Sequence, residues 1–224
     1  MLINKINNFI DKTRENHIVS KSVLRAAILV FRQSFCRNYD IVYSGLSLNS
    51  LPFVSRHRDW LGVQDVVFEG EYAAFLKILD GVDSPRVIDG GANIGMFALY
   101  VLARFPNSCV RSYEASQLTY DVLERNRGLN QDLDWTVKRV ALWSSCDQIS
   151  FGDMEWSTSS RVGGSSECST VVPGLDLPSV ISEIGSPVDL MKIDIEGSEE
   201  AFICANEKSL DDVRNLIIEI HPGE

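Results

Sequence analysis

Ionisable side chains crowd an otherwise apolar stretch of the chain between residues 189 and 199. Lys192 and Asp194 are two residues apart, so they point to the same face if the stretch is a strand. Buried charges are costly without partners, and such clusters therefore pair internally or face a functional site. The stretch predicts either an internal Lys–carboxylate pair or a ligand site that Asp194 faces, with Glu196 or Glu199 ordering the following loop.

A second polar group lies near the end of the chain, where Glu219 and His221 share one face of a predicted strand. A lone terminal histidine is usually a surface group. Beside a carboxylate cluster on a neighbouring strand, however, His221 becomes a candidate general base. We expect no metal here; the alternative is a divalent cation held by carboxylate oxygens of Asp194, Glu196 and Glu219.

A glycine-rich loop follows an apolar run and reads Asp-Gly-Gly-Ala-Asn-Ile-Gly from Asp89 to Gly95. Glycines let a ligand approach the backbone amides, and the next helix points its partly positive N-terminus at that ligand. The Asp89-x-Gly91-x-x-x-Gly95 spacing differs from the Gly-x-Gly-x-x-Gly of dinucleotide sites. Its leading carboxylate suits a cation. The loop therefore favours S-adenosylmethionine (SAM) over NAD, and a turn without any ligand is the alternative.

Glu114 stands at the end of the next predicted strand, 25 residues after Asp89. Two carboxylate oxygens can accept hydrogen bonds from both hydroxyls of a ribose. A glutamate at a strand end is often merely solvated, but its offset from the glycine loop favours the ribose-binding role.

These residues fall at the ends of predicted strands. From about residue 70, strands and helices alternate, which predicts a Rossmann-like, doubly wound, mainly parallel α/β sheet with right-handed crossovers. Ligands of such sheets bind outside the carboxyl ends of the strands. We expect main strands at 86–89, 110–114, 135–142, 188–194 and 215–221, helices at 94–105, 116–130 and 198–205, and a small extra strand pair at 149–151 and 170–172.

Charge is unevenly distributed along the 224 residues, whose net charge is −10. The acidic balance and the lack of an aromatic–basic strip argue against nucleic acid, RNA included, as a partner. Residues 1–40 nevertheless hold seven Lys or Arg against three Asp or Glu, and their pattern predicts helices at about 2–16 and 20–37. These form either a cap on the main domain or a basic segment that contacts an anionic membrane or partner. We thus divide the chain into an N-terminal helical extension, 1–69, and a SAM-binding domain, 70–224.

Cysteine usage and hydropathy indicate the compartment. The five cysteines are odd in number and none has CxxC spacing, which predicts reduced thiols and a cytoplasmic protein rather than disulfides or a zinc site. The longest apolar stretch near the N-terminus, 26–31, is far shorter than the roughly 20 residues of a membrane span. We expect neither a transmembrane segment nor a signal peptide.

Together the motifs resemble the FkbM family of SAM-dependent methyltransferases. The family pattern is a glycine loop Asp-x-Gly-Ala-Asn-x-Gly, a strand ending in Glu, Lys-Ile-Asp-x-Glu-Gly-x-Glu, and Glu-Ile-His. The resemblance covers about 70–222 and implies a class I methyltransferase fold that transfers methyl to oxygen, commonly a hydroxyl of a sugar or secondary metabolite. The matching residues are Asp89–Gly95, Tyr113-Glu114, Lys192–Glu199 and Glu219–His221, with smaller matches at Asn126, Asn130, Ala141-Leu142 and Leu175-Asp176.

The resemblance also implies roles for individual residues. His221 is the first candidate for the catalytic base and Asp194, near the transferred methyl, the second. Family members usually continue after the fifth strand with another helix and an antiparallel strand pair, which often help to form the acceptor pocket. We expect either that the sequence is truncated there or that its N-terminal segment covers that edge of the sheet. A non-catalytic SAM-binding scaffold and a nicotinamide-dependent dehydrogenase are the alternatives, and a homo-oligomer is compatible with all of them. The expected cofactor contacts are Asp89, Gly91, Ala92, Asn93, Gly95, Glu114, Ala141 and Asp194.

Overall fold

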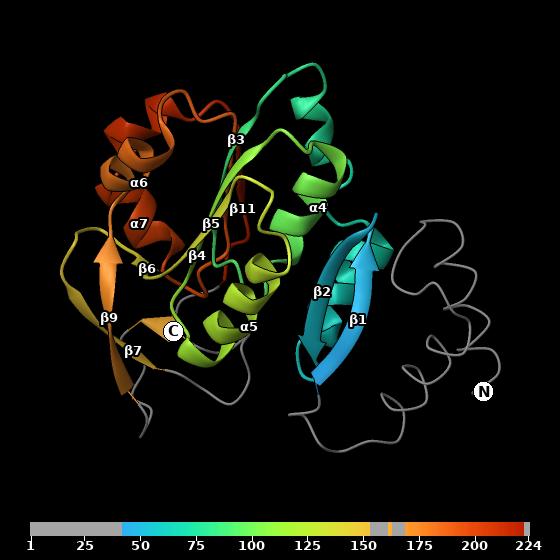
Figure 1. The fold of residues 1–224 in the computed structure, drawn as a ribbon. Coiled ribbons are helices and arrows are strands. Elements are labelled where there is room, and N and C mark those ends of the chain that lie inside the picture. The colour runs from blue at the N-terminus through green and yellow to red at the C-terminus, as the bar shows by residue number, and fades with distance from the viewer. Residues whose placement is uncertain (1–41, 153–160, 163–168, 222–224) are drawn as a thin grey trace.

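A five-stranded parallel sheet forms the centre of the computed structural model, which describes residues 42–152, 161–162 and 169–221 (Figure 1). The strand order is β11-β10-β3-β4-β5, and every neighbouring pair is parallel. The predicted sheet is confirmed. The strands are β3 (Arg86–Gly90), β4 (Cys109–Glu114), β5 (Trp135–Arg139), β10 (Leu190–Ile193) and β11 (Leu216–Ile218).

The chain changes direction across the sheet between β3 and β10. From β3 it winds outward through β4 to β5, and it then returns to build β10 and β11 on the other side of β3. Such a reversal opens a crevice at the carboxyl ends of the two strands that flank it. Lys192 of β10 lies in register with Asp89 of β3. Both predicted motifs therefore end at the same crevice.

Helices cover both faces of the sheet (Figure 1). On one face lie α4 (Met96–Arg104) and α5 (Gln117–Gly128), and on the other lie α6 (Leu177–Ile184) and α7 (Glu199–Ala205). The Ser116 side chain accepts a hydrogen bond from the Thr119 N–H and caps α5. Helix α6 is absent from the sequence predictions, although Asp176 caps it and Pro178 occupies its first turn.

A smaller sheet lies beside the main one and comprises β6 (Ala141–Leu142), β7 (Gln148–Gly152), β8 (Arg161–Val162) and β9 (Ser169–Leu175). The predicted strand pair at 149–151 and 170–172 is confirmed, because β7 and β9 pair antiparallel with Ile149 opposite Val172. The predicted strand 135–142 is divided: β5 ends at Arg139, and Ala141–Leu142 pairs with β9 instead.

A β-hairpin corrects the prediction of a wholly helical extension over residues 1–69. Strands β1 (Val42–Leu48) and β2 (Leu51–Arg56) pair across a turn in which Asn49 and Ser50 both have positive φ, at 44° and 77°. The hairpin forms because Leu48 and Phe53 are buried in the same hydrophobic cluster as residues of α4 and α5. The helices predicted at 2–16 and 20–37 lie outside the described residues.

Short helical turns lead from the hairpin to the sheet. They are α3 (Trp60–Val63), a π-helical turn (Gln64–Glu69) and a 3₁₀ helix (Phe75–Leu79). Buried Asn126 of α5 fastens the hairpin: its side-chain oxygen accepts from the Val54 N–H, and its amide donates to the carbonyls of Val54 and Ile94. Among the described residues, no helix is long and apolar enough to cross a membrane.

Candidate functional site

Two cavities meet at the carboxyl ends of β3 and β10. The first measures about 60 Å³ and the second about 380 Å³. Asn93, Asp194 and Glu196 line both cavities, so the two cavities share this part of their walls. The first cavity is further lined by Gly91, Tyr113, Glu114, Ala115, Thr119, Val140, Ala141, Leu142, Phe151, Ile195 and Ser198.

The glycine loop forms the floor of the first cavity, and two of its glycines are required there. Gly91 has φ +68°, and a Cβ added to it would lie 1.6 Å from the Asp194 carbonyl oxygen. Gly95 has φ +88°, and its Cβ would lie 2.7 Å from side-chain atoms of Leu123 and Trp135. The close approach of β3 to β10 and the entry into α4 therefore both depend on glycine.

Glu114 is partly buried beside the loop. Its two carboxylate oxygens accept hydrogen bonds from the Asn93 N–H and the Ser116 N–H, each 2.9 Å long. Burial raises the pKa of Glu114 to about 7, although these two hydrogen bonds oppose the rise. An acceptor with an elevated pKa lies in the cavity wall, where hydroxyl groups of a ligand could donate to it.

Lys192 joins the two motifs. It is 5% exposed, and its Nζ donates to Asp194 Oδ2 at 3.0 Å and to the Gly91 carbonyl at 3.1 Å. Burial alone would lower the pKa of Lys192, but Asp194 and Asp89 outweigh burial and raise it. The internal Lys–carboxylate pair is therefore present, and Asp194 also lines both cavities. The two interpretations of this stretch, an internal pair and a ligand site that Asp194 faces, are compatible with each other.

Asp89 does not reach either cavity. It is fully buried, accepts a hydrogen bond from Ser112 Oγ at 3.1 Å, and places its Oδ1 3.9 Å from Lys192 Nζ. Burial raises the pKa of Asp89 to about 6. Of the other expected contact residues, Gly91, Asn93, Glu114, Ala141 and Asp194 line the first cavity, Ala92 lines the second, and Gly95 lines neither.

The loop after β10 is held by Glu199. Its carboxylate accepts hydrogen bonds from the Ile195 N–H at 3.0 Å and from the Gly197 N–H at 3.0 to 3.1 Å. Glu196 and Gly197 both have positive φ, at 53° and 94°, so the loop needs this support. Glu199, rather than Glu196, therefore orders the loop, and Glu196 points its side chain toward the cavities.

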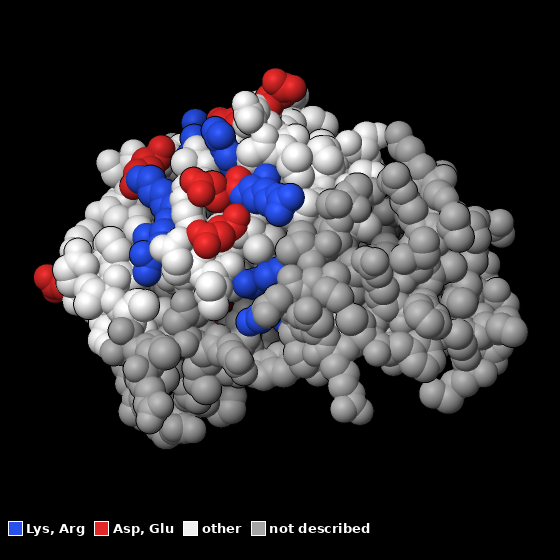
Figure 2. All heavy atoms as spheres, turned by 60° about the horizontal axis from the view of Figure 1, so that its bottom comes forward, with Lys and Arg blue, Asp and Glu red and all other residues white. Residues whose placement is uncertain are grey.

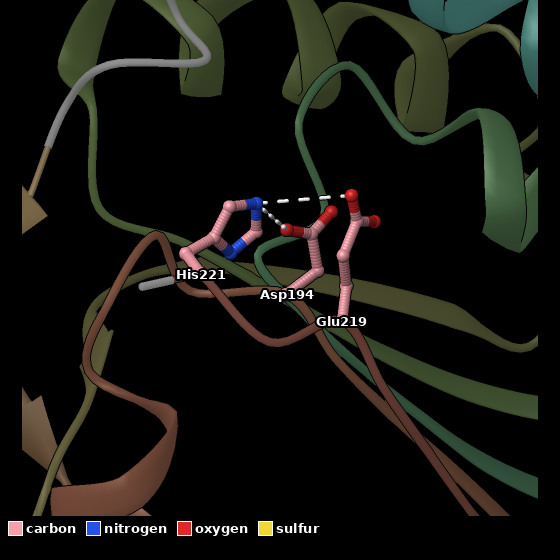
Figure 3. A group of neighbouring side chains, drawn as sticks. All are labelled: Asp194, Glu219 and His221. Carbon is pink, nitrogen blue, oxygen red and sulfur yellow. Dashed lines mark ion pairs between the residues drawn. The ribbon is translucent and has the colours of Figure 1, made fainter. Parts of the chain in front are cut away.

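His221 lies among carboxylates in the wall of the second cavity (Figure 3). Its Nδ1 is 3.2 Å from Glu199 Oε1, within hydrogen-bonding distance. Its Nε2 is 3.9 Å from Asp194, 3.6 Å from Glu196 and 3.7 Å from Glu219. Burial alone would lower the pKa of His221, but the hydrogen bond with Glu199 and these carboxylates raise it.

The sequence predictions missed the outer wall of the second cavity. The segment 59–72 supplies Asp59, Leu61, Gly62, Asp65, Val66, Glu71 and Tyr72 to that wall. None of them belongs to a motif, and only their contact with the sheet makes them part of the site. The apolar side chains of Ile94, Met96 and Phe97 complete this cavity.

Basic and acidic side chains are interspersed on the face drawn in Figure 2. Lys and Arg there stand next to Asp and Glu over the described surface. The described part of this face therefore presents charges of both signs.

The sheet order, the glycine loop at its crevice and the acidic residue ending β4 define a class I methyltransferase fold. A family model described as the methyltransferase FkbM domain matches residues 89–224, more than half of the chain. The chain belongs to the FkbM methyltransferase family, as its motifs predicted.

Two curated fungal proteins are similar to this chain. Methyltransferase sdnD of Sordaria araneosa is 27% identical over 173 residues, covering 61% of this chain and 66% of that protein. Methyltransferase 1 of Beauveria bassiana (strain ARSEF 2860) is 35% identical over 48 residues, covering 21% and 19%. The match thus spans less than two thirds of the length of either relative.

Solved structures with a related fold include two methyltransferases. The FkbM methyltransferase from Methylobacillus flagellatus KT is 17% identical, with a TM-score of 0.43 over 61% of this chain and 32% of that one. The METTL16 methyltransferase domain is 12% identical, with a TM-score of 0.46 over 94% of this chain and 73% of that one.

Proposed function

We propose that this chain is a SAM-dependent O-methyltransferase that acts on a hydroxyl of a sugar or secondary metabolite. The observation that carries the proposal is the junction of two cavities at Asn93, Asp194 and Glu196. A methyl donor in the first cavity and an acceptor in the second would meet at these residues. Such an arrangement supplies the proximity and alignment that in-line transfer needs.

The residues around the first cavity fit SAM. Glu114 would accept hydrogen bonds from the ribose hydroxyls, and Val140, Ala141 and Leu142 would border the adenine. Gly91, which lines this cavity, would border the methionine part. Asp194, negatively charged at the junction, would lie near the sulfonium. SAM itself supplies an activated methyl group on positively charged sulfur.

The second cavity would hold the acceptor. Its apolar side, with Leu61, Met96 and Phe97, suits a carbon framework, and its polar side suits hydroxyls. As the acceptor oxygen bonds to carbon, the hydroxyl proton must leave. His221 is the first candidate to accept it, because its Nε2 has no hydrogen bond to any residue that the structure describes and the ring lines the cavity. Asp194 is the second.

Calorimetric titration with SAM and S-adenosylhomocysteine tests the cofactor half of the proposal. We expect micromolar binding to the wild type and at least a tenfold loss in Glu114→Ala, because a charged acceptor for two hydroxyls is removed. Glu124→Ala, an exposed glutamate on the neighbouring α5, is the matched control and should bind like the wild type. A Glu114→Ala chain that binds SAM as tightly as Glu124→Ala and the wild type would refute the assigned cofactor site.

A second assay tests the reaction. The wild type and His221→Ala are incubated with SAM and a panel of sugars and hydroxylated metabolites, and release of S-adenosylhomocysteine is followed against pH. We expect turnover on a hydroxyl acceptor, with His221→Ala reduced about 10²- to 10⁴-fold. Turnover only on amine acceptors would overturn the O-specificity, and SAM binding with no turnover on any acceptor would overturn the enzyme assignment.

A further inference from the structure

Three side chains at the cavity junction have the composition and spacing of a metal site (Figure 3). We propose that Asp194, Glu219 and His221 bind one divalent transition-metal cation, such as Mn²⁺ or Zn²⁺, on the side facing the second cavity. The inference rests on the proposed function for its role, and it changes the part of His221 from proton acceptor to ligand. It also replaces Glu196 with His221 in the ligand set expected from sequence.

The distances suit a single ion. One ligand atom from each of the three side chains lies within 4.8 Å of the other two. Ligands bonded at about 2.1 Å to one ion lie roughly 3 to 4.2 Å apart. The His221 Nε2 is 3.9 Å from Asp194 Oδ1 and 3.7 Å from Glu219 Oε1, which is too long for a hydrogen bond but within that range. Glu219 is half exposed and free to close the remaining gap.

The orientation of His221 is a separate observation that points to a ligand. Its Nδ1 is hydrogen-bonded to buried Glu199, and an ionised carboxylate can only accept. Nδ1 therefore carries a proton, and Nε2 is the ring nitrogen that faces the carboxylates of Asp194 and Glu219. Metal-bound histidines are held in this way by a carboxylate on their other nitrogen.

Among the described residues, lysine and arginine balance only part of the local negative charge. Lys192 is shared between Asp194 and Asp89. Among the described residues, neither Glu196 nor Glu219 forms an ion pair with a lysine or arginine, and Asp65 and Glu71 add further negative charge to the same cavity wall. A mixed imidazole and carboxylate set favours transition-metal ions over Ca²⁺, which prefers oxygen ligands alone.

The position gives the cation a role. An acceptor hydroxyl in the second cavity could occupy an open coordination position close to the junction with the first cavity. Coordination lowers the pKa of a bound hydroxyl, so its proton can pass to solvent water as the oxygen attacks the methyl carbon and the carbon–sulfur bond breaks.

Binding of Mn²⁺ to the purified chain, stripped with a chelator, tests the proposal directly. Free Mn²⁺ is measured by electron paramagnetic resonance, and Co²⁺ absorption reports nitrogen coordination. We expect one saturable Mn²⁺ per chain, with affinity lowered at least tenfold in Glu219→Gln and in His221→Ala. Glu199→Gln should lower it about tenfold through the orientation of His221. Glu200→Gln, an exposed neighbour, should bind like the wild type.

Calorimetry with SAM on the same samples separates the two proposals. SAM binding by a chain that shows no saturable Mn²⁺ binding would overturn the metal site and leave the proposed function intact. Mn²⁺ binding that Glu219→Gln and His221→Ala do not weaken would also overturn it. Saturable Mn²⁺ binding that both variants weaken would support the site even if SAM failed to bind.

Discussion

Replacement of Gly91 by alanine should damage the site more than the same replacement at any other described glycine. The added Cβ would lie 1.6 Å from the Asp194 carbonyl oxygen, whereas real Cβ atoms essentially never come within 3.0 Å. The ends of β3 and β10 would thus have to separate by at least about 1.4 Å, the difference between these values. That movement would stretch the hydrogen bond from the Asp194 N–H to the Gly90 carbonyl, now 3.1 Å.

Two destabilising contributions, backbone strain and overpacking, add together in the Gly91→Ala variant. An L-residue at the φ of +68° costs about 1 kcal/mol. Forcing the strands apart adds about 1 to 3 kcal/mol, the usual cost of overpacking. We expect the free energy of unfolding to fall by roughly 2 to 4 kcal/mol, and SAM affinity to fall at least tenfold because Asn93 and Asp194 move.

Urea unfolding and calorimetric SAM titration measure these effects. Gly128→Ala is the matched control, because its Cβ would meet nothing within 4 Å and alanine is the better helix former in α5. It should be as stable as the wild type or up to about 1 kcal/mol more stable. A Gly91→Ala chain with the unfolding midpoint and SAM affinity of Gly128→Ala would refute the argued contact between the two strands.

Three further outcomes are expected. Asn126→Ala should lower the free energy of unfolding by about 2 to 3 kcal/mol, seen in urea, because it leaves backbone groups of Val54 and Ile94 unpaired. Burial raises the pKa of Glu114 from 4.5 to about 7, so folding takes up a proton between these pH values. The contribution of Glu114 to the free energy of unfolding should therefore fall as pH rises from about 4.5 to 7. Glu114→Gln should flatten this pH dependence, measured by urea unfolding. Lys192→Met should weaken SAM binding, measured by calorimetry, because it leaves buried Asp89 without its cation.

Local patterns were enough to predict the sheet. Apolar strands that end in Gly90, Glu114 and Ile193 alternate with helices, and the parallel direction of the strands follows from that alternation. The hairpin at 42–56 escaped prediction because its stability comes from distant contacts. Asn126, 72 residues from Val54, forms hydrogen bonds with the hairpin backbone. No local sequence pattern in either segment predicts this contact.

Local sequence patterns also predict one part of the candidate site and miss another. Residues on the ends of β3, β4 and β10 share one crevice because parallel strands end at one edge, which sequence spacing reveals. The 59–72 segment lies outside these strands, and its place in the second cavity depends on tertiary packing alone. Asp89 was expected to face the cofactor. In the structure it is fully buried, and its carboxylate lies against Ser112 and Lys192.

One buried ammonium group explains why Asp194 can serve both cavities. Lys192 holds Asp194 Oδ2 and the Gly91 carbonyl, and its charge also balances Asp89 on the neighbouring strand. Because Oδ2 is occupied, Asp194 keeps Oδ1 for the junction, 3.9 Å from His221 Nε2. The internal ion pair therefore positions the carboxylate instead of competing with its chemistry. A buried pair of this kind stabilises little in net terms, and its consequence here is the alignment of β3 with β10 at the point where donor and acceptor would meet.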